Sequence, residues 1–160
     1  MFLLTAEPID TAKLVGMISQ TSIGAVVTFE GRVRDHNLGR NVSFLEYEVY
    51  GELATREGLA IMEEVRRDFP IANAFAVHRY GKLKLSEVAV TVVVAASHRD
   101  EAFKAARYVI DEIKHRLPIW KQEHYTSGQK AWVGCAGCEK RTSDKLNHAP
   151  DVEVAWIANS

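Results

Sequence analysis

Basic side chains fall where the predicted secondary-structure elements meet, and these residue types could bind an anion. His98 and Arg99 stand between a predicted strand and a predicted helix, a junction where free helix N–H groups favour negative charge. Lys114 lies in the last turn of the same helix, and Lys121 lies on the strand predicted to follow it. Arg34 ends an earlier strand, just before a turn. Together these residues predict a site where lysines and arginines surround an anionic small substrate.

Each of these residues also has a structural explanation. Arg99 could be a solvated first-turn residue, although a cation there opposes the helix dipole. Cations in the last turn, such as Lys114, stabilise a helix by about 0.3–1 kcal/mol. A single lysine on a strand, such as Lys121, usually faces solvent, and the pair Arg32 and Arg34 could protect an edge strand from aggregation. Only their combination favours a functional site.

Other familiar chemistries have no signal in the sequence. No phosphate-binding glycine loop, nucleophile elbow or HExxH motif is present. Cys135 and Cys138 form a single CxxC, and His148 is the only candidate for a further zinc ligand downstream. We interpret the two cysteines as ordinary reduced thiols and predict neither a metal nor a cofactor.

Length and composition indicate one ordinary globular domain of 160 residues, 47% of them apolar and 26% charged. The net charge of −1 argues against non-specific binding of nucleic acid. The longest apolar stretch, residues 88–96, is about half a membrane span. The first residues lack the basic region of a signal peptide. We therefore expect a soluble, cytoplasmic protein that binds neither nucleic acid nor membrane.

Apolar periodicity and breaker residues predict alternating strands and helices. Asp10 is the expected cap of the first helix, Ser97 that of the third, and Gly31 a possible β-bulge. Strands are predicted at the N-terminus and over 23–34, 44–50, 74–80, 88–97, 119–124 and 130–134, and helices over 10–20, 52–69 and from about 98 to 117. We expect 23–34 to pair with 44–50, and 119–124 with 130–134, as hairpins. The order predicts an α+β fold with a mixed, mainly antiparallel sheet and helices packed on it.

Four ordered blocks of sequence resemble the large, catalytic subunit of molybdopterin synthase, the MoaE family. They are GAVVTFEGRVRDHNLG (24–39), HRYGKL with the following Ser86-Glu87 (78–87), the stretch from SHR to Lys114 (97–114), and PIWKQE with the later Trp132-Val133 (118–133). The likeness covers residues 1–134, which we take as the domain, and leaves 135–160 as a C-terminal tail that could be partly ordered. It implies the α/β hammerhead fold of that family.

The resemblance also implies a function. Large subunits of this family form a homodimer, and each protomer binds a small ubiquitin-like sulfur-carrier subunit of the MoaD type, giving a heterotetramer. The carrier's C-terminal Gly-Gly, activated as a thiocarboxylate, enters a pocket and gives sulfur to cyclic pyranopterin monophosphate (precursor Z). Two transfers make the dithiolene of molybdopterin in molybdenum cofactor biosynthesis. No cysteine of the large subunit is needed, because the sulfur arrives on the carrier.

Motif positions carry the family's site residues onto this chain. The two catalytic lysines fall on Lys114 and Lys121. The substrate-binding positions fall on Arg34, His98, Arg99, Phe29, Ile110 and Glu123, and Arg34 is expected to come from the neighbouring protomer. The tail departs from the family pattern: a basic residue expected near Ala136 is absent, and Lys140 or Arg141 could replace it.

Two other functions are compatible with parts of the sequence. A non-catalytic platform for a ubiquitin-like protein would not need Lys114, Lys121 and the His98-Arg99 pair. A phosphate-ester-processing enzyme would normally need carboxylates that hold a metal, and no such cluster is evident. We therefore place both below the sulfurtransferase.

Overall fold

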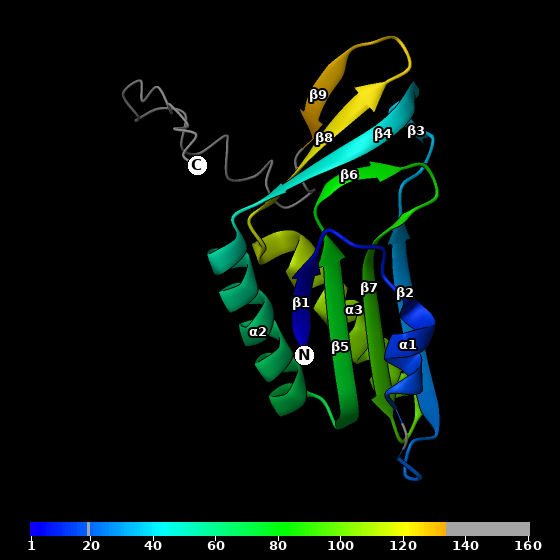
Figure 1. Ribbon diagram of the computed structural model, residues 1–160. Coiled ribbons are helices and arrows are strands. Elements are labelled where there is room, and N and C mark those ends of the chain that lie inside the picture. Colours follow the sequence, from blue (N-terminus) through cyan, green and yellow to red (C-terminus); the bar gives the residue numbers. More distant parts are fainter. Residues whose placement is uncertain (19, 134–160) are drawn as a thin grey trace.

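A computed structural model describes residues 1–18 and 20–133, which form two β-sheets and three helices (Figure 1). In the first sheet the order is β1-β5-β7-β2, from β1 (Phe2–Thr5), β5 (Ile71–Arg79), β7 (Val88–Ala96) and β2 (Ala25–Arg32). Strands β1 and β5 are parallel, and the other neighbours are antiparallel. The predicted α+β class with a mixed, mainly antiparallel sheet is confirmed.

The most apolar strand lies inside the first sheet, as its composition predicts. Residues 89–96 of β7 are all buried, because β5 and β2 flank the strand and helices cover both faces. Helices α2 (Gly51–Asp68) and α3 (Arg99–Arg116) contribute to the core on one face, and the short α1 (Thr11–Gly16) packs on the other (Figure 1). Helix α3 therefore packs directly on the sheet, against β7 and β2.

The second sheet contains β3 (His36–Asn37), β4 (Arg40–Val49), β8 (Ile119–Tyr125) and β9 (Lys130–Val133) in that order, with β6 (Gly81–Lys84) also paired to β4. It has a core of its own, which includes Val42, Leu45, Leu83 and Tyr125. Figure 1 shows this sheet beyond one end of the first. It is joined directly to α3, because Leu117 and Pro118 alone separate that helix from β8.

Several local predictions are confirmed. The Asp10 side chain caps α1 by accepting a hydrogen bond from the Lys13 N–H, although the helix is shorter than predicted. The register between β2 and β7 shifts between Gly31 and Arg32, which is the predicted bulge. Strands β8 and β9 form the predicted hairpin. No helix among residues 1–18 and 20–133 is long and apolar enough to cross a membrane.

Two predictions are wrong. Strand β2 does not pair with β4: its whole length pairs with β7, and β4 pairs with β3, β6 and β8. Ser97 does not cap α3, because the helix begins one residue later with His98 at the N-cap, where no side chain accepts a hydrogen bond. Ser97 still faces Gly24 at the end of the β2–β7 ladder, where a side chain at residue 24 would collide with the Ser97 carbonyl. The suggested late strand near Trp156 lies outside the described residues.

Candidate functional site

A groove between β2 and α3 holds three of the predicted site residues. The groove has a volume of about 460 Å³ and is lined by Phe29 from β2 and by Ile110 and Lys114 from α3, among others. Ile110 is buried and Phe29 half-buried, so the floor is apolar. Lys114 is exposed at the C-terminal end of the helix, which leaves its ammonium free to meet a solute. The groove therefore offers an apolar surface beside the Lys114 ammonium and the ion pair of Arg107 and Asp111, which also line it.

A second group of predicted residues lies on β8. The Lys121 ammonium forms an ion pair with Glu123, with 3.1 Å between Nζ and Oε1. Glu123 is only 2% exposed, and its Oε2 accepts hydrogen bonds from Asn37 Nδ2 (3.0 Å) and the Tyr125 hydroxyl (2.9 Å). Burial raises the pKa of Glu123, but the hydrogen bonds from Lys121, Tyr125 and Asn37 outweigh it and hold that pKa below its usual value. Glu123 is thus a buried, ionised partner for Lys121.

Arg34 is connected to this second group through one side chain. Its Nη2 donates to Asn37 Oδ1 at 3.0 Å, and the same Asn37 amide donates to Glu123. Arg34 itself is exposed. Within a single chain, the structure therefore brings Arg34, Glu123 and Lys121 into one hydrogen-bonded series.

A buried histidine, His78, contacts the half-buried Tyr47. Tyr47 on β4 is in register with Lys121 on β8, and its ring meets the His78 ring edge-on, with 5.4 Å between centroids. Burial lowers the pKa of His78 to about 4, and the nearby charge of Lys114 contributes in the same direction. Lys114 therefore acts electrostatically on His78, which contacts Tyr47, the register partner of Lys121.

His98 and Arg99 lie apart from these residues. Both are exposed at the N-terminal end of α3, and Lys114 is near the other end. The 15 residues from Arg99 to Lys114 correspond to about 22 Å at the helical rise per residue. One chain therefore does not bring His98 and Arg99 to Lys114.

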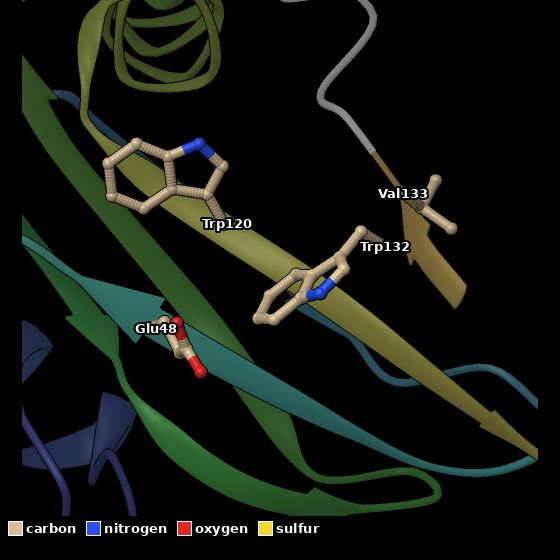
Figure 2. Close-up of a pocket in the computed structure, with 4 residues that line it drawn as sticks. All are labelled: Glu48, Trp120, Trp132 and Val133. Atoms are coloured by element: carbon tan, nitrogen blue, oxygen red, sulfur yellow. The ribbon is translucent and has the colours of Figure 1, made fainter. Parts of the chain in front are cut away.

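A smaller cavity lies on the second sheet and contains none of the predicted site residues. It measures about 210 Å³ and is lined by Glu48, Trp120, Trp132 and Val133. Figure 2 shows the two indole rings and the Glu48 carboxylate beside one another over β4 and β8. Both tryptophans are about half exposed, so the cavity is an open, aromatic surface.

Among residues 1–18 and 20–133, no group of three or more His, Cys, Asp or Glu side chains could hold a metal ion. Cys135, Cys138 and His148 lie outside the described residues. Their interpretation stays a prediction.

Sequence reasoning missed three residues of this region. Asn37 falls in a stretch that the sequence marks only as a turn, and Tyr125 follows the end predicted for its strand. His78 was noted only as part of a matched block. The hydrogen bond from Asn37 to Glu123 joins residues that are 86 positions apart in the sequence, so no local sequence pattern predicts it.

The fold and the site define an α+β protein in which Lys114 lines a groove and Lys121, on the strand that follows the helix, pairs with a buried carboxylate. The chain belongs to the MoaE family, because the family model described as MoaE protein matches residues 4–116. It is 42% identical over 127 residues to a molybdopterin synthase catalytic subunit of Pyrococcus abyssi, covering 79% of this chain and 85% of that one. The resemblance of the four sequence blocks is thereby confirmed.

Solved structures agree with this assignment. The chain resembles a crystal structure of molybdopterin synthase from Staphylococcus aureus with a TM-score of 0.77 and 35% identity, covering 82% of this chain and 95% of that chain. A complex of subunits 1 and 2 of molybdopterin-converting factor from Helicobacter pylori has a TM-score of 0.68 at 18% identity, covering 82% and 89% of the two chains. The second likeness shows the fold alone.

Proposed function

We propose that this chain is the catalytic half of a sulfurtransferase that makes molybdopterin. It would move sulfur from the C-terminal thiocarboxylate of a small ubiquitin-like carrier to cyclic pyranopterin monophosphate. The observation that supports the proposal is the groove that Lys114 lines, together with Lys121 on the strand that follows α3, paired to the buried Glu123. The names of its relatives, molybdopterin synthase catalytic subunits, support the same activity.

In each round a carbon–sulfur bond forms on the pterin side chain, and the bond between the carrier's acyl carbon and sulfur breaks. The substrate carbon gives up one oxygen, and the carrier leaves as a carboxylate with one oxygen more. The exchange balances through water and needs no oxidant or reductant. Two rounds place the two sulfurs of the dithiolene.

The lysines suit the charges that this exchange creates. Attack by the thiocarboxylate and hydrolysis of the acyl–sulfur bond both pass through anionic oxygen, which an ammonium stabilises in a water-poor site. Lys114 has the apolar groove beside it, where an extended carrier tail and the pterin could lie. Lys121 is held in place by Glu123 and can donate a proton as well as charge.

The cyclic phosphate of the substrate needs groups that bind an anion. His98 and Arg99, at the start of α3, are residues of this type. They lie about 22 Å along α3 from Lys114, so they can serve the same substrate only from a second copy. We therefore propose a homodimer with two sites, each built from both chains. The series from Arg34 through Asn37 to Glu123 supports a role for Arg34 in its own chain's site, rather than in its neighbour's.

A carrier subunit completes the proposed assembly, a heterotetramer of two large and two small subunits. The two-subunit complex from Helicobacter pylori has the same fold in its matching chain and is consistent with such a partner. The resemblance to the MoaE family implies the partner's chemistry: a C-terminal Gly-Gly that is narrow enough to enter a groove and carries the thiocarboxylate at its end.

The test is single-turnover conversion of cyclic pyranopterin monophosphate by the purified protein with a thiocarboxylated carrier, read as dithiolene product. Lys114→Ala should lower the rate at least about 100-fold, because it removes the charge at the groove. Lys104→Ala is the matched control: Lys104 is exposed on the same helix and pairs with Asp100 outside the groove. Absence of product with a stable carrier complex would indicate a binding platform instead.

A further inference from the structure

We propose that Asn37 is a positioning residue that couples Arg34 to the Glu123–Lys121 ion pair. The proposal rests on the proposed function, because the pair matters only if Lys121 acts on a substrate. Asn37 would not touch the substrate. It would fix the direction of the Glu123 carboxylate, and thereby the place of the Lys121 ammonium and of the Arg34 guanidinium.

The two hydrogen bonds of Asn37 use both ends of its amide. Oδ1 accepts from Arg34 Nη2, and Nδ2 donates to Glu123 Oε2, each at 3.0 Å. A short side chain that accepts and donates at once is a property of asparagine: aspartate has the same shape but no donor when ionised. The chemical identity of residue 37 therefore matters, and not only its size.

Glu123 depends on this bond for its orientation. Lys121 contacts Oε1, whereas Asn37 and Tyr125 both donate to Oε2. A carboxylate that is 2% exposed has no bulk water to replace a lost donor, so loss of one partner leaves it under-satisfied. The two donors on Oε2 direct Oε1 toward Lys121.

The hairpin holds Asn37 firmly enough for this role. Asn37 pairs with Arg40 across the turn, and Arg40 stacks over the Tyr125 ring at 3.5 Å and donates to Gln129 at 2.9 Å. Turn chemistry does not account for the asparagine, because the left-handed positions of the turn are Leu38 (φ 48°) and Gly39 (φ 75°). Asn37 has an extended conformation and a tertiary contact instead.

The experiment compares Asn37→Asp and Asn37→Ala with wild type in the full complex with thiocarboxylated carrier. Asn37→Asp keeps the acceptor for Arg34 but places a second carboxylate against Glu123. We expect kcat to fall about 10- to 100-fold in both variants, as for loss of a hydrogen bond to a charged group. Asn41→Ala is the matched control, since Asn41 is exposed on the same hairpin and outside the series.

A double-mutant cycle separates positioning from a general structural effect. In a Glu123→Gln background the harm done by Asn37→Asp should largely disappear, because the repulsion between two carboxylates is gone. The free energies of unfolding of the same variants, measured with urea, give a second double-mutant cycle that needs no turnover. Additive effects in both measurements would overturn the proposal, as would Asn37 variants within twofold of wild type, or a loss in Asn41→Ala as large as in Asn37→Ala.

The two proposals fail in different ways. If wild type makes no dithiolene, the proposed function fails, and the unfolding cycle alone then decides whether Asn37 and Glu123 are coupled. If wild type turns over and the Asn37 variants do too, only the role of Asn37 is rejected.

Discussion

His78 is a buried imidazole among the residues that surround the two lysines. Its Nδ1 lies 2.7 Å from the Arg79 carbonyl, so that nitrogen carries the hydrogen and the ring is neutral. Burial lowers its pKa from 6.5 to about 4, and the charge of Lys114 adds to the effect. A protonated His78 ring would add a second positive charge near Lys114. Because the ring is neutral, the positive charge of this region comes from the lysines.

This lowered pKa predicts a pH dependence of stability. Between pH 6.5 and about 4 the unfolded chain takes up a proton at His78 and the folded chain does not, so the free energy of unfolding falls as the pH falls. The contribution of His78 to this loss should reach about 3 kcal/mol at about pH 4 and grow no further below it. Urea unfolding from pH 7.5 to 3.5 measures it.

His78→Phe, which keeps a ring beside Tyr47 but cannot titrate, should lose this part of the slope. His115→Ala is the control, because it removes an exposed imidazole from the last turn of α3 and should keep the slope. A slope unchanged in His78→Phe would contradict the assignment.

At the residue scale, the sequence predicts charges better than it predicts their partners. Lys114 and Lys121 could be found because motif blocks and element ends mark them. The link from Glu123 to Asn37 could not, because it depends on how the 36–41 hairpin packs on β8. His98 and Arg99 were correctly placed at a helix start, but their distance from Lys114 follows only from the length of α3.

At the element scale, periodicity located the strands but not all of their neighbours. The apolar run of β7 predicts burial on both faces, and the structure places it between two strands. Because β2 and β4 are consecutive along the chain, the sequence predicts that they pair. Strand β2 instead pairs with β7, which begins more than fifty residues after β2 ends. Both β2 and β4 alternate, and alternation defines a face rather than a pairing partner. Strand β6 was not predicted, since its four residues are too few for a periodic signal.

The packing of α2 on β1 gives a prediction at this scale. Gly58 is buried in α2, and a methyl group there would collide with the ring of Phe2, which is 3% exposed. Gly58→Ala should therefore lower the free energy of unfolding by about 1–3 kcal/mol, despite the better helix propensity of alanine. Gly51→Ala in the same helix meets nothing within 4 Å and should be neutral or stabilising. Thermal unfolding of both variants checks this, and equal behaviour would contradict the packing argument.

At the scale of the whole molecule, the proposed site draws on both sheets. The first sheet carries α3 with Lys114, and the second carries Lys121 and Glu123. The short connection through Leu117 and Pro118 limits how far apart Lys114 and Lys121, seven residues apart in the sequence, can lie. The same helix carries His98 and Arg99 away from that site, and this separation is the strongest argument for a second chain.

A mixture of inactive variants tests the two-chain site. If Arg99 acts in its neighbour's site, unfolding and refolding Lys114→Ala together with Arg99→Ala produces mixed dimers in half of the population. In each mixed dimer one of the two sites has both residues, so about a quarter of wild-type activity should return. Lys114→Ala mixed with Arg34→Ala should stay inactive if Arg34, which Asn37 links to Glu123 of its own chain, serves the same chain's site as Lys114. Recovery in the second mixture would place Arg34 in the neighbouring protomer's site, and no recovery in the first would show that His98 and Arg99 do not complete the site from a second copy.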